Sequence, residues 1–171
     1  IDKSVPQGIV TIDRELDWTN TDKKVSIKVS DSYSGVKDVI VTDDAGNSIT
    51  LIAESASVYT FFSDNEDYHL KVIDKADNVF EYDFKVERID KTVPTIIANL
   101  GALSADKTSQ DIDVIAAVGS SGVQSFNVYY KENASDAYPN TPSHTLDPTQ
   151  LTCVYKAQKN GWYRFEIVNQ V

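Results

Sequence analysis

Four aspartates, Asp2, Asp31, Asp74 and Asp77, are the residues whose type and position could hold a metal ion. Carboxylate oxygens are the hard ligands that Ca²⁺ requires. Asp also favours turns, because its side chain bonds nearby backbone groups. None of the Asp-rich segments has EF-hand spacing. The residue types therefore leave two hypotheses open, a calcium site and a set of turn-forming residues.

Aromatic side chains near the segment 131–147 could carry a different chemistry. Tyr129, Tyr130, Tyr138 and Trp162 could form a flat patch that binds a sugar or a protein. The alternative is a connection stiffened by proline, whose aromatic side chains cover a small core of their own. Both interpretations stay open at the level of sequence.

Catalysis has little support in the sequence. Neither His69 nor His144 has an evident partner of the kind found in a nucleophilic triad, and no glycine-rich phosphate loop is present. The single cysteine, Cys153, excludes an internal disulfide and fits a small apolar residue on a strand. We expect no enzyme activity and no cofactor other than calcium.

The net charge and the lengths of the apolar runs argue against two further classes of function, nucleic-acid binding and membrane insertion. The chain has 171 residues and a formal net charge of -10, so the phosphates of nucleic acids would be repelled. No apolar run approaches the ~20 residues that a membrane-spanning helix needs. We expect no nucleic-acid partner and no membrane insertion of this segment.

The apolar residues alternate with a period of two, which is typical of half-buried antiparallel strands. Val25, Ile27 and Val29 alternate with polar residues, and turn signals rich in Asp, Asn and Gly separate such runs. The predicted strands are 7–13, 24–31, 36–43, 48–53, 56–62, 67–74, 79–87, 95–99, 111–118, 123–131, 143–147, 150–157 and 162–169.

The sequence contains an internal repeat of this strand pattern. Ile1-Asp2-Lys3-Ser4-Val5-Pro6 recurs as Ile89-Asp90-Lys91-Thr92-Val93-Pro94, an offset of 89 − 1 = 88. Later strands match at an offset of 87 and, after a longer connection, of 95. The repeat predicts two domains, 1–88 and 89–171, with Gly35 and Gly122 in equivalent tight turns. A break in the alternation after each glycine predicts a β-bulge in both copies.

These motifs carry a family resemblance. Trp18-Thr19-Asn20, Asp31-Ser32-Tyr33-Ser34-Gly35-Val36, Asp74-Lys75-Ala76-Asp77-Asn78 and the hexapeptide at Ile89, in this order, resemble the bacterial immunoglobulin-like repeats of Gram-positive cell-surface and secreted proteins. The second copy departs from the pattern at Ala105, Val118 and Asn169. The resemblance implies an all-β fold of two tandem immunoglobulin-like β-sandwiches and no catalytic residues. In that topology the four aspartates would lie at one end of the first sandwich, beside the incoming linker.

Two details follow from this topology. Tyr68 and Tyr163 open equivalent strands, where each ring would be buried and its hydroxyl would bond nearby backbone, as in a tyrosine corner. The alternative is an aromatic residue that is merely half-buried. The second copy has no counterpart of 79–87, so its strand 162–169 would keep a free edge. We expect that the full protein continues; a strand donated by another chain is the alternative.

The sequence thus predicts a non-catalytic structural spacer or adhesion module in an extracellular, cell-surface or cell-wall protein. Its partners would be neighbouring modules of the same chain. The alternatives are a module that binds a carbohydrate or host ligand and the accessory domains of an extracellular hydrolase.

Overall fold

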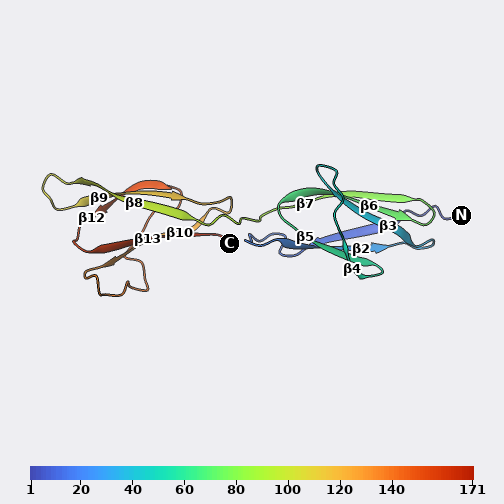
Figure 1. The fold of residues 1–171 in the computed structure, drawn as a ribbon, viewed down its shortest axis with the longest axis horizontal. Helices are drawn as coiled ribbons and strands as arrows, with labels where there is room; N and C mark the ends of the chain where they lie inside the picture. The colour runs from blue at the N-terminus through green and yellow to red at the C-terminus, as the bar shows by residue number, and fades with distance from the viewer. The chain divides into compact units, whose positions relative to one another are not determined.

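The computed structural model describes every residue from Ile1 to Val171 and confirms that the chain is all-β. It contains no helix, and hence none that could cross a lipid bilayer. The chain divides into two compact units, Ile1–Ile89 (unit 1) and Asp90–Val171 (unit 2; Figure 1). The division falls one residue after the boundary that the repeated hexapeptide predicts.

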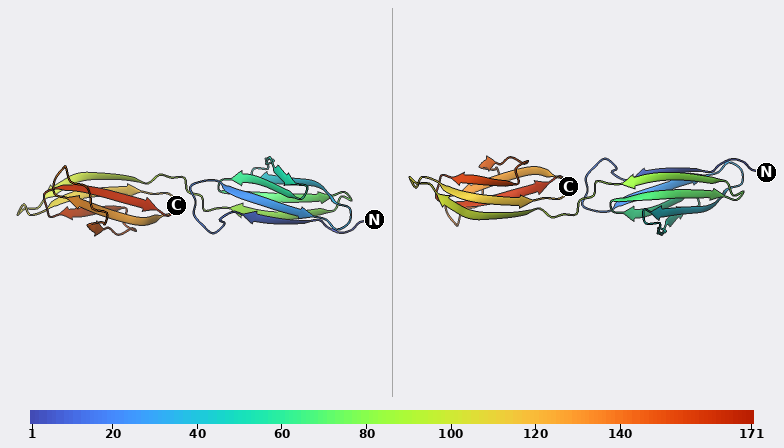
Figure 2. Two further views of the ribbon diagram at one scale, coloured as in Figure 1. Left: turned by 90° about the horizontal axis from the view of Figure 1, so that it is seen from below. Right: turned by 90° about the horizontal axis from the view of Figure 1, so that it is seen from above.

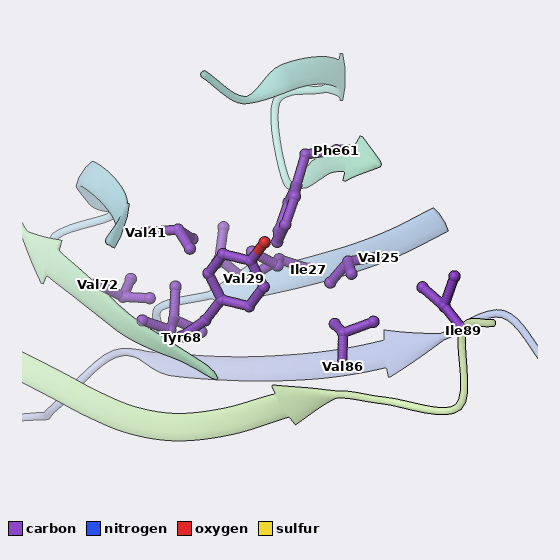
Figure 3. Close-up of a cluster of buried hydrophobic side chains, with 10 residues drawn as sticks. Val25, Ile27, Val29, Val41, Phe61, Tyr68, Val72, Val86 and Ile89 are labelled. Carbon is purple, nitrogen blue, oxygen red and sulfur yellow. The ribbon is translucent and has the colours of Figure 1, made fainter. Parts of the chain in front are cut away.

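Unit 1 is a sandwich of two antiparallel sheets, with strand orders β1-β2-β5-β4 and β3-β6-β7 (Figure 1). Its strands are β1 (Gln7–Ile12), β2 (Lys23–Ser30), β3 (Val36–Asp43), β4 (Ile52–Ser55), β5 (Val58–Ser63), β6 (Glu66–Asp74) and β7 (Val79–Val86). The core lies between the sheets, because the alternating apolar residues of β2 face those of β6. Figure 3 shows Tyr68 among these side chains, with Ile89 at one end of the cluster.

Unit 2 has the sheet orders β12-β9-β8 and β11-β10-β13, and Figure 2 shows the strands of these sheets side by side. Its strands are β8 (Thr95–Leu103), β9 (Gln110–Ala117), β10 (Val123–Lys131), β11 (His144–Thr145), β12 (Thr152–Ala157) and β13 (Trp162–Asn169). Phe126 and Val128 of β10 pack against Ile112 and Val114 of β9 to form the core. No strand pairs with the outer edge of β13.

Three of the predicted strands need correction. The segment 48–53 is not one strand, because Ser48 bridges to Thr42 of β3 whereas Ile52 begins β4 in the other sheet. β8 continues to Leu103, four residues beyond its predicted end, past an irregularity in its pairing with β9. The predicted strand 143–147 shortens to β11, which pairs with β10 through two residues.

The details predicted from the repeat are present in both units. Gly35 and Gly122 have φ angles of 83° and 76°, which L residues adopt at a cost. Register shifts follow each glycine, between Val36 and Asp38 and between Val123 and Ser125. These shifts confirm the two predicted β-bulges.

The two tyrosines differ from one another. The hydroxyl of Tyr68, in a buried ring, lies 2.7 Å from Oγ of Ser63, so the prediction of a backbone partner is wrong for this residue. The hydroxyl of Tyr68 is thus linked to the turn by the side chain of Ser63, whose own hydroxyl donates to the carbonyl of Asp64. Tyr163 donates to the carbonyl of Lys159 at 2.9 Å, as predicted, but its ring is only half-buried, which the prediction of a buried ring did not allow.

Candidate functional site

Asp31 organises the turn between β2 and β3. Its Oδ2 accepts the backbone N–H groups of Tyr33 at 2.9 Å and Gly35 at 2.8 Å. The left-handed conformation of Gly35 bends the chain so that both N–H groups face this one oxygen. Oδ1 of Asp31 is buried and has no hydrogen-bond partner. One carboxylate oxygen is thus satisfied locally and the other is not.

Asp74 ends β6 and is fully buried. Its Oδ1 accepts the N–H groups of Ala76 and Asn78, and its Oδ2 accepts Nδ2 of Asn78, each at 2.8 Å. Burial alone would raise the pKa of Asp74, but the hydrogen bonds from Asn78 and Ala76 together lower it. Asp74 is therefore a buried carboxylate that stays ionised at neutral pH.

Asp2 brings the N-terminal segment to these two turns. Its Oδ1 accepts the N–H of Ser4 at 2.8 Å and its Oδ2 accepts the N–H of Ser34 at 3.0 Å. The bond from Ser4 outweighs desolvation, and the pKa of Asp2 is lowered. One oxygen each from Asp2, Asp31 and Asp74 lies within 4.8 Å of the other two. We call these three side chains the carboxylate cluster.

Asp77 does not join the cluster. It occupies the turn after β6 with φ at 65°, and its side chain is 76% exposed. Its Oδ1 lies 2.8 Å from Nζ of Lys37, and this hydrogen bond raises the pKa of that lysine. The turn that buries Asp74 directs Asp77 outward, so three of the four predicted aspartates come together.

The carboxylate cluster has the chemistry of a hard-cation site, with three anionic side chains and the buried, unpartnered Oδ1 of Asp31. Backbone N–H groups already occupy part of its oxygen surface. A Ca²⁺ ion takes six to eight oxygen ligands, so carbonyl groups or water would have to supply the others. The residues present fit calcium in type, with the free oxygen of Asp31 as the first ligand.

Unit 2 contains the same linker contact without the cluster. Oδ2 of Asp90 accepts the N–H of Ser121 at 2.8 Å and its hydroxyl at 2.6 Å, and Oδ1 accepts the N–H of Thr92 at 3.0 Å. These bonds, from Ser121 first, lower the pKa of Asp90 to about 2. Val118 and Asn169 occupy the positions of Asp31 and Asp74. Asp90 thus repeats the contacts of Asp2 as a single carboxylate.

The residue before Asp90 belongs to unit 1. Ile89 is buried in its core, and its N–H and carbonyl bond to the side chain of Asn65 at 2.9 and 2.7 Å. Thr19, from the Trp18-Thr19-Asn20 motif, forms a parallel bridge with Ile89. Sequence reasoning missed Asn65, although Asn160 lies in the equivalent turn of the second copy at an offset of 160 − 65 = 95.

Three of the four predicted aromatic residues, Tyr129, Tyr138 and Trp162, lie on the outer face of the sheet of β10 and β13, and Tyr130 does not. Tyr129 lies on the outer face of β10, where the guanidinium of Arg164 stands 4.3 Å from its ring centre and 5.0 Å from that of Tyr138. Tyr130 turns to the other face and contacts Tyr163 at 5.1 Å. Trp162 is 54% exposed. The guanidinium of Arg164 therefore occupies part of the ring surface of Tyr129 and Tyr138 that a sugar would use.

His69 has two carboxylate partners that were not evident from the sequence. Its Nδ1 lies 2.6 Å from Oδ1 of Asp83 and its Nε2 lies 3.7 Å from Oε1 of Glu81. The register of β6 and β7 places His69 directly opposite Asp83. The hydrogen bond to Asp83 raises the pKa of His69, which is half-buried and has a carboxylate near each ring nitrogen. This geometry is an ion pair rather than a base beside a nucleophile.

No family model matches the chain, and no curated protein sequence matches it. The resemblance to bacterial immunoglobulin-like repeats therefore rests on the chain's own motifs, whose side chains form the turns and linker contacts described above.

Proposed function

We propose that the chain is a non-catalytic structural spacer or adhesion module of a multi-domain bacterial surface or secreted protein. The observation that supports this role is that the adjacent residues Ile89 and Asp90 contact different units. Ile89 is held by the core and Asn65 of unit 1, whereas Asp90 is held by Ser121 of unit 2. A spacer needs such a connection, because a free linker would let neighbouring modules swing.

Further support comes from the repetition of this contact. Asp2 bonds to Ser4 and Ser34 as Asp90 bonds to Thr92 and Ser121, so each unit holds the aspartate of the segment that enters it. A module that carries its own linker contact suits a chain of repeated domains. The acidic surface, with a net charge of -10, suits exposure to the medium outside the cell.

The test is the motion of the two units in solution. We expect NMR relaxation to show the units of the wild-type chain tumbling together, and Asn65→Ala to make their tumbling more independent because Ile89 loses both side-chain contacts. Asn160→Ala, at the equivalent turn of unit 2, is the matched control and should leave the coupling unchanged. Independent tumbling of the wild-type units would refute a spacer that works by a stiff connection.

We further propose that calcium binds the carboxylate cluster and stiffens the entry of the linker into unit 1. The specific observation in its favour is the buried Oδ1 of Asp31, which no protein group satisfies. Calcium that binds only the folded state would stabilise it, by ~2.7 kcal/mol at a hundredfold excess over Kd. We expect millimolar calcium to raise the melting temperature of unit 1.

The two variants that test the site each remove one carboxylate charge from a turn. Asp31→Asn removes one charge from the cluster and should abolish the calcium-dependent shift, whereas Asp106→Asn, in a turn of unit 2, should leave it intact. An unchanged melting temperature of the wild-type chain at millimolar calcium would refute the site. Calorimetric titration gives a second readout that does not depend on unfolding.

A further inference from the structure

The bond between Asp147 and Pro148 is the only peptide bond in the chain that joins an aspartate to a proline. The other prolines follow valine, tyrosine or threonine. A proline nitrogen carries no hydrogen and belongs to a tertiary amide, so it accepts a proton more readily than other peptide nitrogens. An aspartate carboxylate can attack its own backbone carbonyl and close a cyclic anhydride. The two residue types therefore combine a nucleophile with a good leaving group.

The structure places this bond in a tight turn between β11 and β12. Before the turn, Leu146 is buried and donates its N–H to the carbonyl of Phe126 at 2.8 Å. After it, the carbonyl of Leu151 accepts the N–H of Ala116 at 2.7 Å. The residues between, 147–150, are all exposed. The turn is thus anchored at both ends and open to water.

The carboxylate of Asp147 is folded back beside the bond. Its Oδ1 accepts the N–H of Thr149 at 2.9 Å and the hydroxyl of the same residue at 2.7 Å. Because Thr149 follows the proline, an oxygen bonded to its N–H lies next to the peptide group in between. Oδ2 has no hydrogen-bond partner. The Thr149 hydroxyl, and then its N–H, lower the pKa of Asp147, and no charged side chain contributes. Asp147 therefore keeps an ionised, unpartnered oxygen in more acidic solution than an ordinary aspartate.

The carbonyl that this oxygen would attack is polarised. The backbone oxygen of Asp147 accepts the N–H of Gln150 at 3.1 Å. An N–H group on a carbonyl oxygen stabilises the negative charge that develops there during a nucleophilic attack. The residues of one turn thus position the nucleophile, polarise the carbonyl and supply the leaving nitrogen.

A second turn of unit 2 has the carboxylate contacts without the proline. Oδ1 of Asp106 accepts the N–H of Thr108 at 3.1 Å and its hydroxyl at 2.8 Å, as Oδ1 of Asp147 does with Thr149. Lys107 takes the place of the proline. The bond between Asp106 and Lys107 is therefore an internal control for the effect of the leaving nitrogen.

We propose that the chain cleaves itself between Asp147 and Pro148 in mildly acidic solution. Oδ2 of Asp147 attacks the backbone carbonyl carbon of the same residue. The bond from that carbon to the nitrogen of Pro148 breaks, and the nitrogen leaves as an amine with a proton taken from hydronium. Water then opens the cyclic anhydride and restores the side chain, so the net reaction is hydrolysis of one peptide bond. The inference does not depend on the spacer role or on calcium.

Strand pairing would hold the two products together. The fragment 148–171 contains β12, which pairs with β9, and β13, which pairs with β10. The cut should therefore be seen under denaturing conditions and not as a loss of the fold.

The test incubates the full chain between pH ~3 and pH ~5, with tryptophan fluorescence to establish that it stays folded. Denaturing mass spectrometry should show fragments 1–147 and 148–171, whose masses sum to that of the chain plus one water. The rate should rise as the pH falls and level off once Asp147 is protonated. A synthetic peptide of residues 144–152, which lacks the anchored turn, should be cleaved more slowly.

Three variants separate the contributions within the turn. Asp147→Asn should abolish the cleavage because it removes the nucleophile. Pro148→Ala should reduce it to the level of the bond between Asp106 and Lys107. Thr149→Val keeps the N–H donor but loses the hydroxyl, so cleavage should be about fivefold slower.

Three outcomes would overturn the proposal. The first is the absence of both fragments from the folded chain at every pH tested. The second is cleavage of Asp147→Asn at the rate of the wild type, which would mean that the carboxylate is not the nucleophile. The third is an equal rate for the chain and the free peptide, which would mean that the fold does not prepare the bond.

Discussion

Asp90→Asn probes the linker contact of unit 2 most directly. The side-chain bonds of Asp90, from Ser121 first, lower its pKa from 3.8 to about 2. At about 1.4 kcal/mol for each pKa unit, the ionised carboxylate contributes on the order of 2 kcal/mol to the stability of unit 2 at neutral pH. The amide keeps the shape, but it loses the charge and turns an NH₂ group toward N–H donors. We expect unit 2 to lose about 2 kcal/mol.

The direction in which the stability difference between wild type and Asp90→Asn changes with pH also follows from the lowered pKa. A carboxylate whose pKa is depressed on folding stabilises the protein above its unfolded pKa, and this contribution is lost as the pH falls through the folded pKa. The difference between wild type and Asp90→Asn should therefore be complete above pH ~4 and shrink toward pH ~2.

The assay is urea unfolding, followed through Trp162 in a Trp18→Phe background so that only unit 2 is seen. Asp106 is the control, because its pKa is also lowered to about 2, by Ser104 and Thr108, but in an exposed turn. Solvent screens such contacts, so Asp106→Asn should cost less. Equal losses for the two variants, or a loss for Asp90→Asn that does not depend on pH, would refute the reasoning.

The remaining predictions concern unit 1. Tyr68→Phe removes the hydroxyl bonded to Ser63 and should cost about 1 kcal/mol in chemical unfolding. Ser63→Ala should cost less in this background than in the wild type, because only its bond to the carbonyl of Asp64 is then left to lose. Because the pKa of His69 is raised, by Asp83 first, its stabilising contribution should be present below pH ~6.5 and lost as the pH rises through the folded pKa; Asp83→Asn should weaken this dependence and leave the part due to Glu81. Lys23→Met frees two loop carbonyls and should speed amide exchange in that loop; unchanged exchange would contradict this role.

Alternation predicted most strands because each sheet has one face in the core and one in solvent. Val25, Ile27 and Val29 are buried as their period of two requires. Turn positions were also predictable where backbone conformation restricts the residue, as at Gly35 and Gly122. The segment 48–53 failed because its residues pair with two different sheets, and a local pattern does not record which neighbour a residue meets.

Side-chain partners were much harder to predict. Lys23 is in phase with the apolar residues of β2, which was a readable signal, yet its burial depends on two loop carbonyls that accept its ammonium group. Burial, with a smaller effect of Arg88, lowers the pKa of Lys23. Arg164 likewise meets Tyr138 only because the connection after β10 folds back over the sheet. Such contacts join residues whose separation in the sequence follows no regular spacing, so a periodic pattern does not predict them.

A comparison of the two units shows that docking of the linker aspartate does not depend on the carboxylate cluster. Asp90 docks with Val118 and Asn169 at the positions where unit 1 has Asp31 and Asp74, so holding the linker aspartate does not require two further carboxylates. Each added carboxylate repels the others, and burial without a partner makes an oxygen costlier still. The turns explain most of the oxygens of Asp31 and Asp74, but not the buried Oδ1 of Asp31. A bound cation would account for that oxygen and offset the repulsion within the cluster, which is why the calcium proposal applies to unit 1 alone.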